Sequence, residues 1–255
     1  MKSLAYRVDG PPDGPVVVLG SSLGTTGSVW EPQLAALAAT HRVVRYDHRG
    51  HGDSPAPPGP YAIEELGGDV LALLDRLEVD RADLGGLSLG GMVAMWLAAH
   101  APERVRRLAL VCTSARPAQE EMWRQRAATV RAGGMAAVTD LVVERWFTED
   151  FITRRPDVVA WTRAMVAGTD AAAYAACCEV VATLDLEPVL PRITAPTLVV
   201  AGARDPAFPF PHTERIVAAI AGSRLAVVDA AHLASVERAD IVTELLIGFY
   251  SGGGS

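Results

Sequence analysis

Residues 86–90 read Gly-Leu-Ser-Leu-Gly, a pattern that takes the chain through a sharp turn and constrains the fold more than any other segment. Glycines two positions before and after Ser88 let the backbone turn tightly without a side-chain clash. Residues 82–86 have a weak strand pattern, and the apolar run 89–100 predicts a helix packed centrally on a sheet. A serine on such a unit projects above the sheet at the positive end of the helix. The alternative is a turn that contains serine by chance.

Short apolar runs of strand length recur along the chain and alternate with longer helical patterns. The further strands predicted from these runs are residues 16–19, 43–46, 107–112, 197–201 and 225–228. Apolar residues at helical spacing predict helices at residues 63–77, 216–220 and 241–249. Strands buried on both faces read as continuous apolar runs, and their alternation with helices implies a mostly parallel sheet covered on both faces. The predicted fold class is therefore α/β.

The alternation stops between residues 114 and 192, where helical patterns follow one another without a clear strand. The helices predicted there are residues 122–130, 136–147, 158–167 and 171–181. We therefore predict an α/β core, residues 1–113 and 193–250, with an α-helical cap inserted at residues 114–192. Residues 251–255 have the composition of a flexible linker and are predicted to be a tail, either a cloning remnant or the start of a linker.

Composition excludes several classes of function. The 255 residues are 50% apolar, carry a net charge of -7 and show no basic stripe, so nucleic acid is not expected as a partner. The chain contains no apolar run long enough to span a membrane and no signal peptide at its start. The three cysteines, two of them adjacent, imply no disulfide framework, and we expect a cytoplasmic protein.

A nucleophilic serine needs a base to take its proton and a carboxylate to orient that base. Asp205 follows the predicted strand 197–201, and His232 follows the predicted strand 225–228. Both would lie with Ser88 at the carboxyl edge of the sheet, in the chain order Ser, Asp, His that this strand–turn–helix motif requires. Asp229 is a competing carboxylate, but it lies too near His232 in sequence for the usual arrangement.

An oxyanion hole would complete this site. One donor is expected to be the backbone N–H of Leu89, directly after the nucleophile, and the other an N–H of the loop at residues 20–24. Within that loop we predict Leu23 as the donor, with Ser22 as the alternative.

The segment from Asp47 to Ser54 is rich in glycine and contains His48 and His51. Two histidines at this spacing could bind zinc. No further ligand cluster accompanies them, so a structural turn is the favoured interpretation, and neither a metal nor a cofactor is predicted.

Several segments together share the pattern of one family. In the predicted core they are Ser21-Ser22-Leu23-Gly24-Thr25, Trp30, Arg45-Tyr46-Asp47, Arg49-Gly50-His51-Gly52 and Gly86-Leu87-Ser88-Leu89-Gly90-Gly91-Met92. In the predicted cap they are Trp123, Arg126, Gly134-Met135, Arg145-Trp146-Phe147-Thr148 and Tyr174-Ala175-Ala176-Cys177-Cys178, and near the end they are Ala230-Ala231-His232-Leu233 and Glu237. The chain thereby resembles the bacterial 3-oxoadipate enol-lactonases of the α/β-hydrolase superfamily. Some members of that family are fused to a decarboxylase domain, which would fit a linker at the tail.

The resemblance implies hydrolysis of a small five-membered lactone with a free carboxylate, which gives 3-oxoadipate in aromatic catabolism. Arg126 and Arg145 are candidate partners of that carboxylate, although each could instead be a solvated or structural arginine. Trp146 either lines the lactone pocket or packs the cap, and Ser22 is a further candidate substrate contact. The alternatives are another carboxylesterase, a cofactor-free haloperoxidase, or a non-catalytic ligand receptor of the same fold. The oligomeric state is not predicted.

Overall fold

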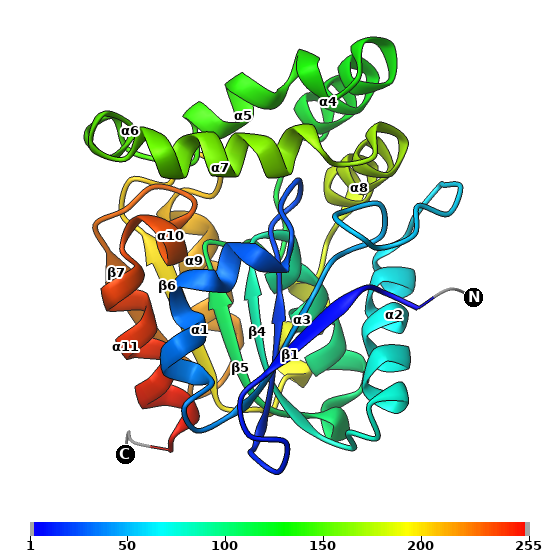
Figure 1. Cartoon of the computed structure of the whole chain (residues 1–255). Coiled ribbons are helices and arrows are strands. Elements are labelled where there is room, and N and C mark those ends of the chain that lie inside the picture. The colour runs from blue at the N-terminus through cyan, green and yellow to red at the C-terminus, as the bar shows by residue number, and fades with distance from the viewer. Residues whose placement is uncertain (1–2, 253–255) are drawn as a thin grey trace.

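The computed structural model describes residues 3–252, whose strands form one sheet with helices on both faces (Figure 1). The strands are β1 (Tyr6–Asp9), β2 (Val16–Gly20), β3 (Arg42–Tyr46), β4 (Ala82–Leu87), β5 (Val105–Val111), β6 (Thr197–Gly202) and β7 (Arg224–Val228). Their order across the sheet is β1-β3-β2-β4-β5-β6-β7, and β1 is antiparallel to β3 while the other neighbours are parallel. The predicted α/β class with a mostly parallel sheet is confirmed.

The helices that flank the sheet fall into two groups (Figure 1). On one face α1 (Glu31–Leu37) packs against α11 (Ala239–Tyr250), which follows the short α10 (Ala234–Glu237). The other group consists of α2 (Ile63–Arg76), α3 (Leu89–His100) and α9 (Phe210–Ala219). Helix α3 contacts β2, β4 and β5 and is buried nearly all round, as its uniformly apolar sequence predicts.

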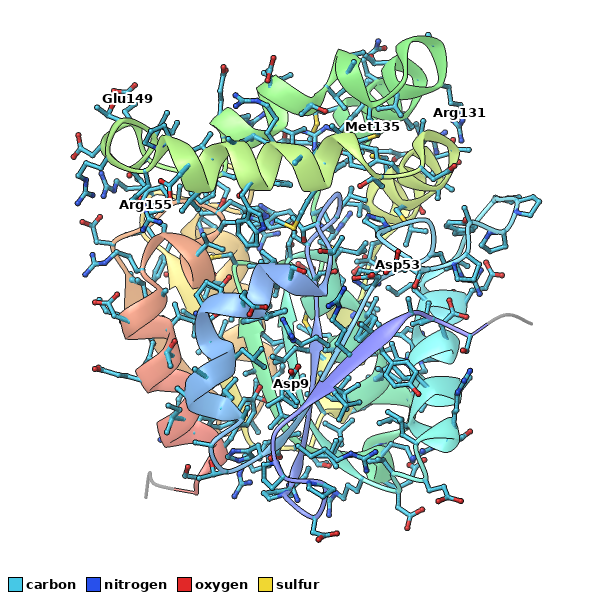
Figure 2. The ribbon with its side chains drawn as sticks, viewed as in Figure 1. Asp9, Asp53, Arg131, Met135, Glu149 and Arg155 are labelled. Atoms are coloured by element: carbon cyan, nitrogen blue, oxygen red, sulfur yellow. The ribbon has the colours of Figure 1, made fainter. Side chains whose placement is uncertain are left out.

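Between β5 and β6 the described chain forms helices and no strand, and helices α4 to α8 of this segment lie above the carboxyl ends of the parallel strands (Figure 1). This helical layer consists of α4 (Glu120–Gly133), α5 (Thr139–Glu144), α6 (Glu149–Arg154), α7 (Pro156–Ala167) and α8 (Ala171–Thr183). Charged side chains such as Arg131, Glu149 and Arg155 point outward from it (Figure 2). The exact borders of a cap at residues 114 and 192 stay a prediction.

One predicted helix of this layer is wrong. Residues 136–147 do not form a single helix, because α5 ends at Glu144 and the chain is non-helical from Trp146 to Thr148. The Trp146 carbonyl accepts from Leu233 N–H at 3.0 Å, and the Thr148 hydroxyl caps α6, which was not predicted. A contact with a distant loop thus replaces the continuation of the helix.

Three other features of the fold also depart from the sequence pattern. The half-buried edge strand β1 and the short helix α1 were not predicted, since neither shows a clear apolar period. Strand β7 was expected to be buried on both faces, but it is an edge strand in which Leu225 and Val227 are 40% and 54% exposed. Of the predicted tail, residues 253–255 lie outside the described residues.

Within residues 3–252 no single helix is long and apolar enough to cross a membrane, although α7 and α8, bent by 95° at their junction, pass that test of length and composition together.

Candidate active site

Ser88 lies between β4 and α3 in a strained backbone conformation, with φ 55° and ψ -113°. A Cβ atom on Gly86 would lie 2.3 Å from the Gly90 carbonyl carbon, and one on Gly90 would lie 2.4 Å from that of Gly20. The turn therefore requires glycine on both sides of the serine. It is held in place because Ser88 N–H donates to the Val111 carbonyl at 3.0 Å and the Thr113 hydroxyl donates to the Ser88 carbonyl at 2.7 Å.

His232 and Asp205 are brought together at the same edge of the sheet. The Nδ1 atom of His232 lies 2.9 Å from Oδ2 of Asp205, and both side chains are buried. The other carboxylate oxygen accepts from the N–H groups of Ala207 and Phe208 at 2.8 and 3.2 Å. Because a carboxylate only accepts, His232 carries its proton on Nδ1, and Nε2 accepts no hydrogen bond from residues 3–252. This is the arrangement a general base requires.

The loop that carries His232 is fastened to the helical layer on both sides of the histidine. The Glu237 carboxylate accepts from Ala231 N–H at 3.0 Å and from the N–H and hydroxyl of Thr148. On the other side, Leu233 N–H donates to the Trp146 carbonyl. The layer above the sheet therefore fixes the position of the imidazole.

Asp229, the competing carboxylate, does not approach the histidine ring in this way. Its carboxylate instead pairs with Arg204 at 2.8 Å, and both side chains are well exposed. Asp205 is therefore the carboxylate that this structure pairs with His232.

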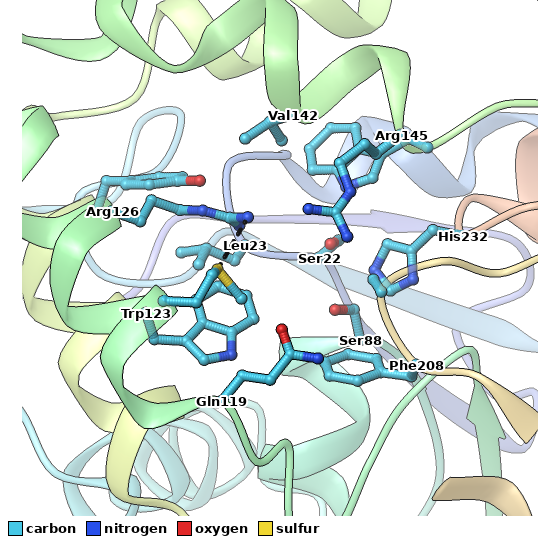
Figure 3. Close-up of a pocket in the computed structure, with 14 residues that line it drawn as sticks. Ser22, Leu23, Ser88, Gln119, Trp123, Arg126, Val142, Arg145, Phe208 and His232 are labelled. Atoms are coloured by element: carbon cyan, nitrogen blue, oxygen red, sulfur yellow. Dashed lines mark hydrogen bonds between the residues drawn. The ribbon is translucent and has the colours of Figure 1, made fainter. Parts of the chain in front are cut away.

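A pocket between the sheet edge and the helical layer collects nearly all of the predicted site residues (Figure 3). Those lining it are Ser22, Leu23, Ser88, Arg126, Arg145, Trp146 and His232. Asp205, which contacts His232, and Leu89, at the start of α3, are both buried and are not among the lining residues. Ser88 makes no hydrogen bond to His232 among the described contacts, and such catalytic contacts often tighten only when substrate binds.

The remaining lining residues had no role predicted for them: Gln119, Met122, Trp123, Val142, Tyr174, Ala207 and Phe208. The ring of Phe208 meets that of His232 edge-on, with 5.5 Å between centroids. No signal in the sequence marks Phe208 or Gln119, because both lie in irregular segments and reach the pocket through tertiary contacts. Trp123 and Tyr174 belong to segments already noted for their family pattern.

The pocket contains two arginines and a tyrosine whose donors are not paired with a carboxylate of residues 3–252. Arg126 stacks on Trp123 at 4.5 Å from the ring centroid and donates to the Met122 sulfur at 3.5 Å, and Arg145 donates to the Pro206 carbonyl at 3.3 Å. Within residues 3–252 neither guanidinium forms an ion pair, and the buried Tyr174 hydroxyl has no hydrogen-bond partner. Burial raises the pKa of Tyr174 well above its ordinary value, so the phenol keeps its proton as a donor.

No group of three or more histidine, cysteine or acidic side chains in the described part of the chain could hold a metal ion. His48 and His51, considered above as zinc ligands, are both engaged in hydrogen bonds to the backbone.

The chain is similar in sequence and in structure to several known proteins. Residues 14–239 match the family described as alpha/beta hydrolase fold. The chain is 39% identical to 3-oxoadipate enol-lactonase 2 of Acinetobacter baylyi, over 92% of this chain and 88% of that protein. It is 36% identical to a protein of Variovorax paradoxus named as the carbamate hydrolase RutD, over 84% and 82% of the two chains. The crystal structure of the enol-lactonase from Burkholderia xenovorans LB400 superposes with a TM-score of 0.96 and 45% identity, covering 97% and 96% of the two chains.

Proposed function

The chain belongs to the alpha/beta hydrolase fold family, and from that premise we propose that it is a serine hydrolase that opens the ring of 3-oxoadipate enol-lactone. The proposal draws support from the similar proteins named as enol-lactonases and from the groups that line the pocket.

The reaction proceeds in two acyl-transfer steps. Ser88 attacks the lactone carbonyl while Nε2 of His232 takes the hydroxyl proton, and Asp205 stabilises the imidazolium that forms. The ring C–O bond then breaks, the enol oxygen receives the proton from His232, and the enol tautomerises to a ketone. Water activated by His232 next attacks the acyl group on Ser88, and the serine recovers its proton as 3-oxoadipate leaves.

Negative charge on the carbonyl oxygen is stabilised by two backbone donors, the N–H groups of Leu23 and Leu89. Leu23 N–H donates no hydrogen bond within residues 3–252, and the first N–H groups of a helix have no intrahelical acceptor. Both groups are therefore available to an oxyanion at the carbonyl bound by Ser88.

One observation carries the choice of substrate: two guanidinium groups that form no ion pair with residues 3–252 lie in the same pocket as Ser88 and His232. In a chain with a net charge of -7, such groups select an anionic ligand locally. A lactone that bears an acetate side chain supplies one carboxylate for them, and the Tyr174 hydroxyl offers a further donor.

The test follows ring opening of the lactone by ultraviolet absorbance, beside an uncharged aryl ester and an alkyl carbamate. We expect kcat/KM to be highest for the lactone. A preference for the carbamate would favour the activity named for the Variovorax paradoxus protein, and activity on the aryl ester alone would indicate a general esterase. Binding of the lactone without turnover of any substrate would favour a receptor.

Replacing Arg126 with glutamine is expected to raise KM for the lactone by about 10- to 100-fold, the effect of losing a charge-assisted hydrogen bond of roughly 1.5–3 kcal/mol. KM for the uncharged aryl ester should change little. Arg131→Gln is the matched control on the same helix, because Arg131 pairs with Glu179 on the outer surface. An equal rise in KM for both substrates would contradict the assignment of Arg126 to the carboxylate.

A further inference from the structure

The turn at residues 47–54 lies against the loop that carries Leu23, and the proposed mechanism gives it no role. At its centre His51 is 0% exposed, and both of its ring nitrogens contact the backbone. Nδ1 lies 2.8 Å from the Arg49 carbonyl oxygen, and Nε2 lies 2.9 Å from the backbone nitrogen of Gly24. A carbonyl only accepts and a backbone N–H only donates, so His51 carries its proton on Nδ1 and accepts at Nε2.

The contact with Gly24 falls on the central peptide of a tight turn. Ser22 and Thr25 close this turn, with Thr25 N–H and the Thr25 hydroxyl both donating to the Ser22 carbonyl, at 3.0 and 2.9 Å. Gly24, the third residue, has φ +83°, which is the value of a type II turn. Type I and type II turns differ in the orientation of their central peptide, here the one that joins Leu23 to Gly24.

His51 selects between these two orientations. In the observed one, the Gly24 N–H points at the lone pair of Nε2. In a type I turn the Leu23 carbonyl oxygen would point that way instead, and two acceptors would face each other without water. The buried imidazole therefore favours the type II turn. The Ser22 carbonyl that closes this turn belongs to the same planar peptide as the Leu23 N–H, so the closed turn also holds the direction of that N–H.

We propose that His51 is a positioning residue that fixes the loop Ser21–Thr25 through Gly24 N–H and so aims the Leu23 N–H at the oxyanion. The inference rests on the proposed function, because it assigns a support to the oxyanion hole used there.

The His51 imidazole is uncharged at neutral pH, and the turn that carries it is bound to neighbouring elements. Burial lowers the pKa of His51 to about 4, so Nε2 remains an acceptor at neutral pH. The Arg49 carbonyl accepts the hydrogen bond from Nδ1–H, and the Arg49 guanidinium binds Asp69 and Glu65 of α2. His48 in the same turn contacts the Ser21 carbonyl at 3.0 Å, at the other end of the loop. The turn therefore connects the loop Ser21–Thr25 to helix α2.

Two substitutions separate the two contacts of the imidazole. In His51→Gln the side-chain oxygen can occupy the place of Nε2 and accept from Gly24, whereas in His51→Asn the amide can reach only the Arg49 carbonyl. Measured on the aryl ester, His51→Asn is expected to lower kcat by about 10- to 100-fold, below the 10²–10³ expected for complete loss of an oxyanion donor. KM should change little in either variant. The kcat of His51→Gln should stay within about 5-fold of the wild-type value and well above the kcat of His51→Asn.

A second readout does not depend on activity. Hydrogen exchange of the Gly24 amide, followed by NMR, should be slow in the wild type and in His51→Gln and markedly faster in His51→Asn. Equal kcat values for the two variants, or a slow Gly24 amide in His51→Asn, would overturn the inference. A wild type that hydrolyses no ester would contradict the proposed function, while the exchange rates would still decide whether His51 holds the loop.

Discussion

The Ser88→Ala substitution is expected to lower kcat for the enol-lactone by a factor of about 10⁶, which is the size of effect seen when a triad serine is removed. Alanine leaves no nucleophile for the carbonyl, so the acyl-enzyme route is closed. The pocket, the guanidinium groups and the oxyanion donors would remain, and a residual rate of roughly 10³–10⁴ over water is expected from them. The loss should therefore appear in kcat, with the affinity for the product nearly unchanged.

A matched control is available because another serine, Ser114, is hydrogen-bonded to a histidine. The hydroxyl of Ser114 lies 2.8 Å from Nδ1 of His212, yet neither residue is among those lining the pocket. Ser114→Ala should keep kcat within a factor of about 3 of wild type, as expected for a substitution away from the reacting atoms. Full activity in Ser88→Ala, together with loss of activity in Ser114→Ala, would show that Ser88 had been wrongly assigned as the nucleophile.

The parts of the fold that sequence predicts well are those with local causes. The glycines around Ser88 are required by contacts within a few residues of it, or with the strand directly beside it. The uniformly apolar α3 could be placed at the centre of the sheet for the same reason. By contrast, the interruption at Trp146 depends on Leu233, and the exposure of β7 depends on its place at the sheet edge.

The residues of the candidate site also fall into those that local sequence patterns predict and those that depend on distant contacts. Ser88, Asp205 and His232 each follow a predicted strand, and parallel strands bring their carboxyl ends to one edge, so their meeting could be foreseen. Phe208 reaches the pocket from an irregular segment that no period describes. The hydrogen bond that Gly24 N–H donates to His51 joins residues 27 apart in sequence, so a glycine-rich pattern could indicate the turn without showing which loop the turn contacts.

Replacing Asp205 with asparagine is expected to lower kcat by about 10⁴ while leaving the fold intact. The geometry explains the size of the effect. Two backbone N–H groups, of Ala207 and Phe208, point at one carboxylate oxygen, so the amide oxygen of asparagine will take that place. Its NH₂ group must then face His232 and donate to Nδ1, which moves the ring proton to Nε2. The imidazole would then present a proton, and no lone pair, to Ser88.

The control for this variant is Asp229→Asn, which removes the carboxylate that precedes the histidine by three positions and pairs with Arg204 at the surface. Exposed ion pairs contribute about 0–1 kcal/mol, so stability should fall only slightly and kcat should stay near the wild-type value. Stopped-flow measurement of acylation and thermal unfolding of both variants separate a chemical loss from a folding defect. A larger loss of kcat in Asp229→Asn than in Asp205→Asn would mean that the working carboxylate had been assigned to the wrong strand end, and the tautomer argument for His232 would fall with it.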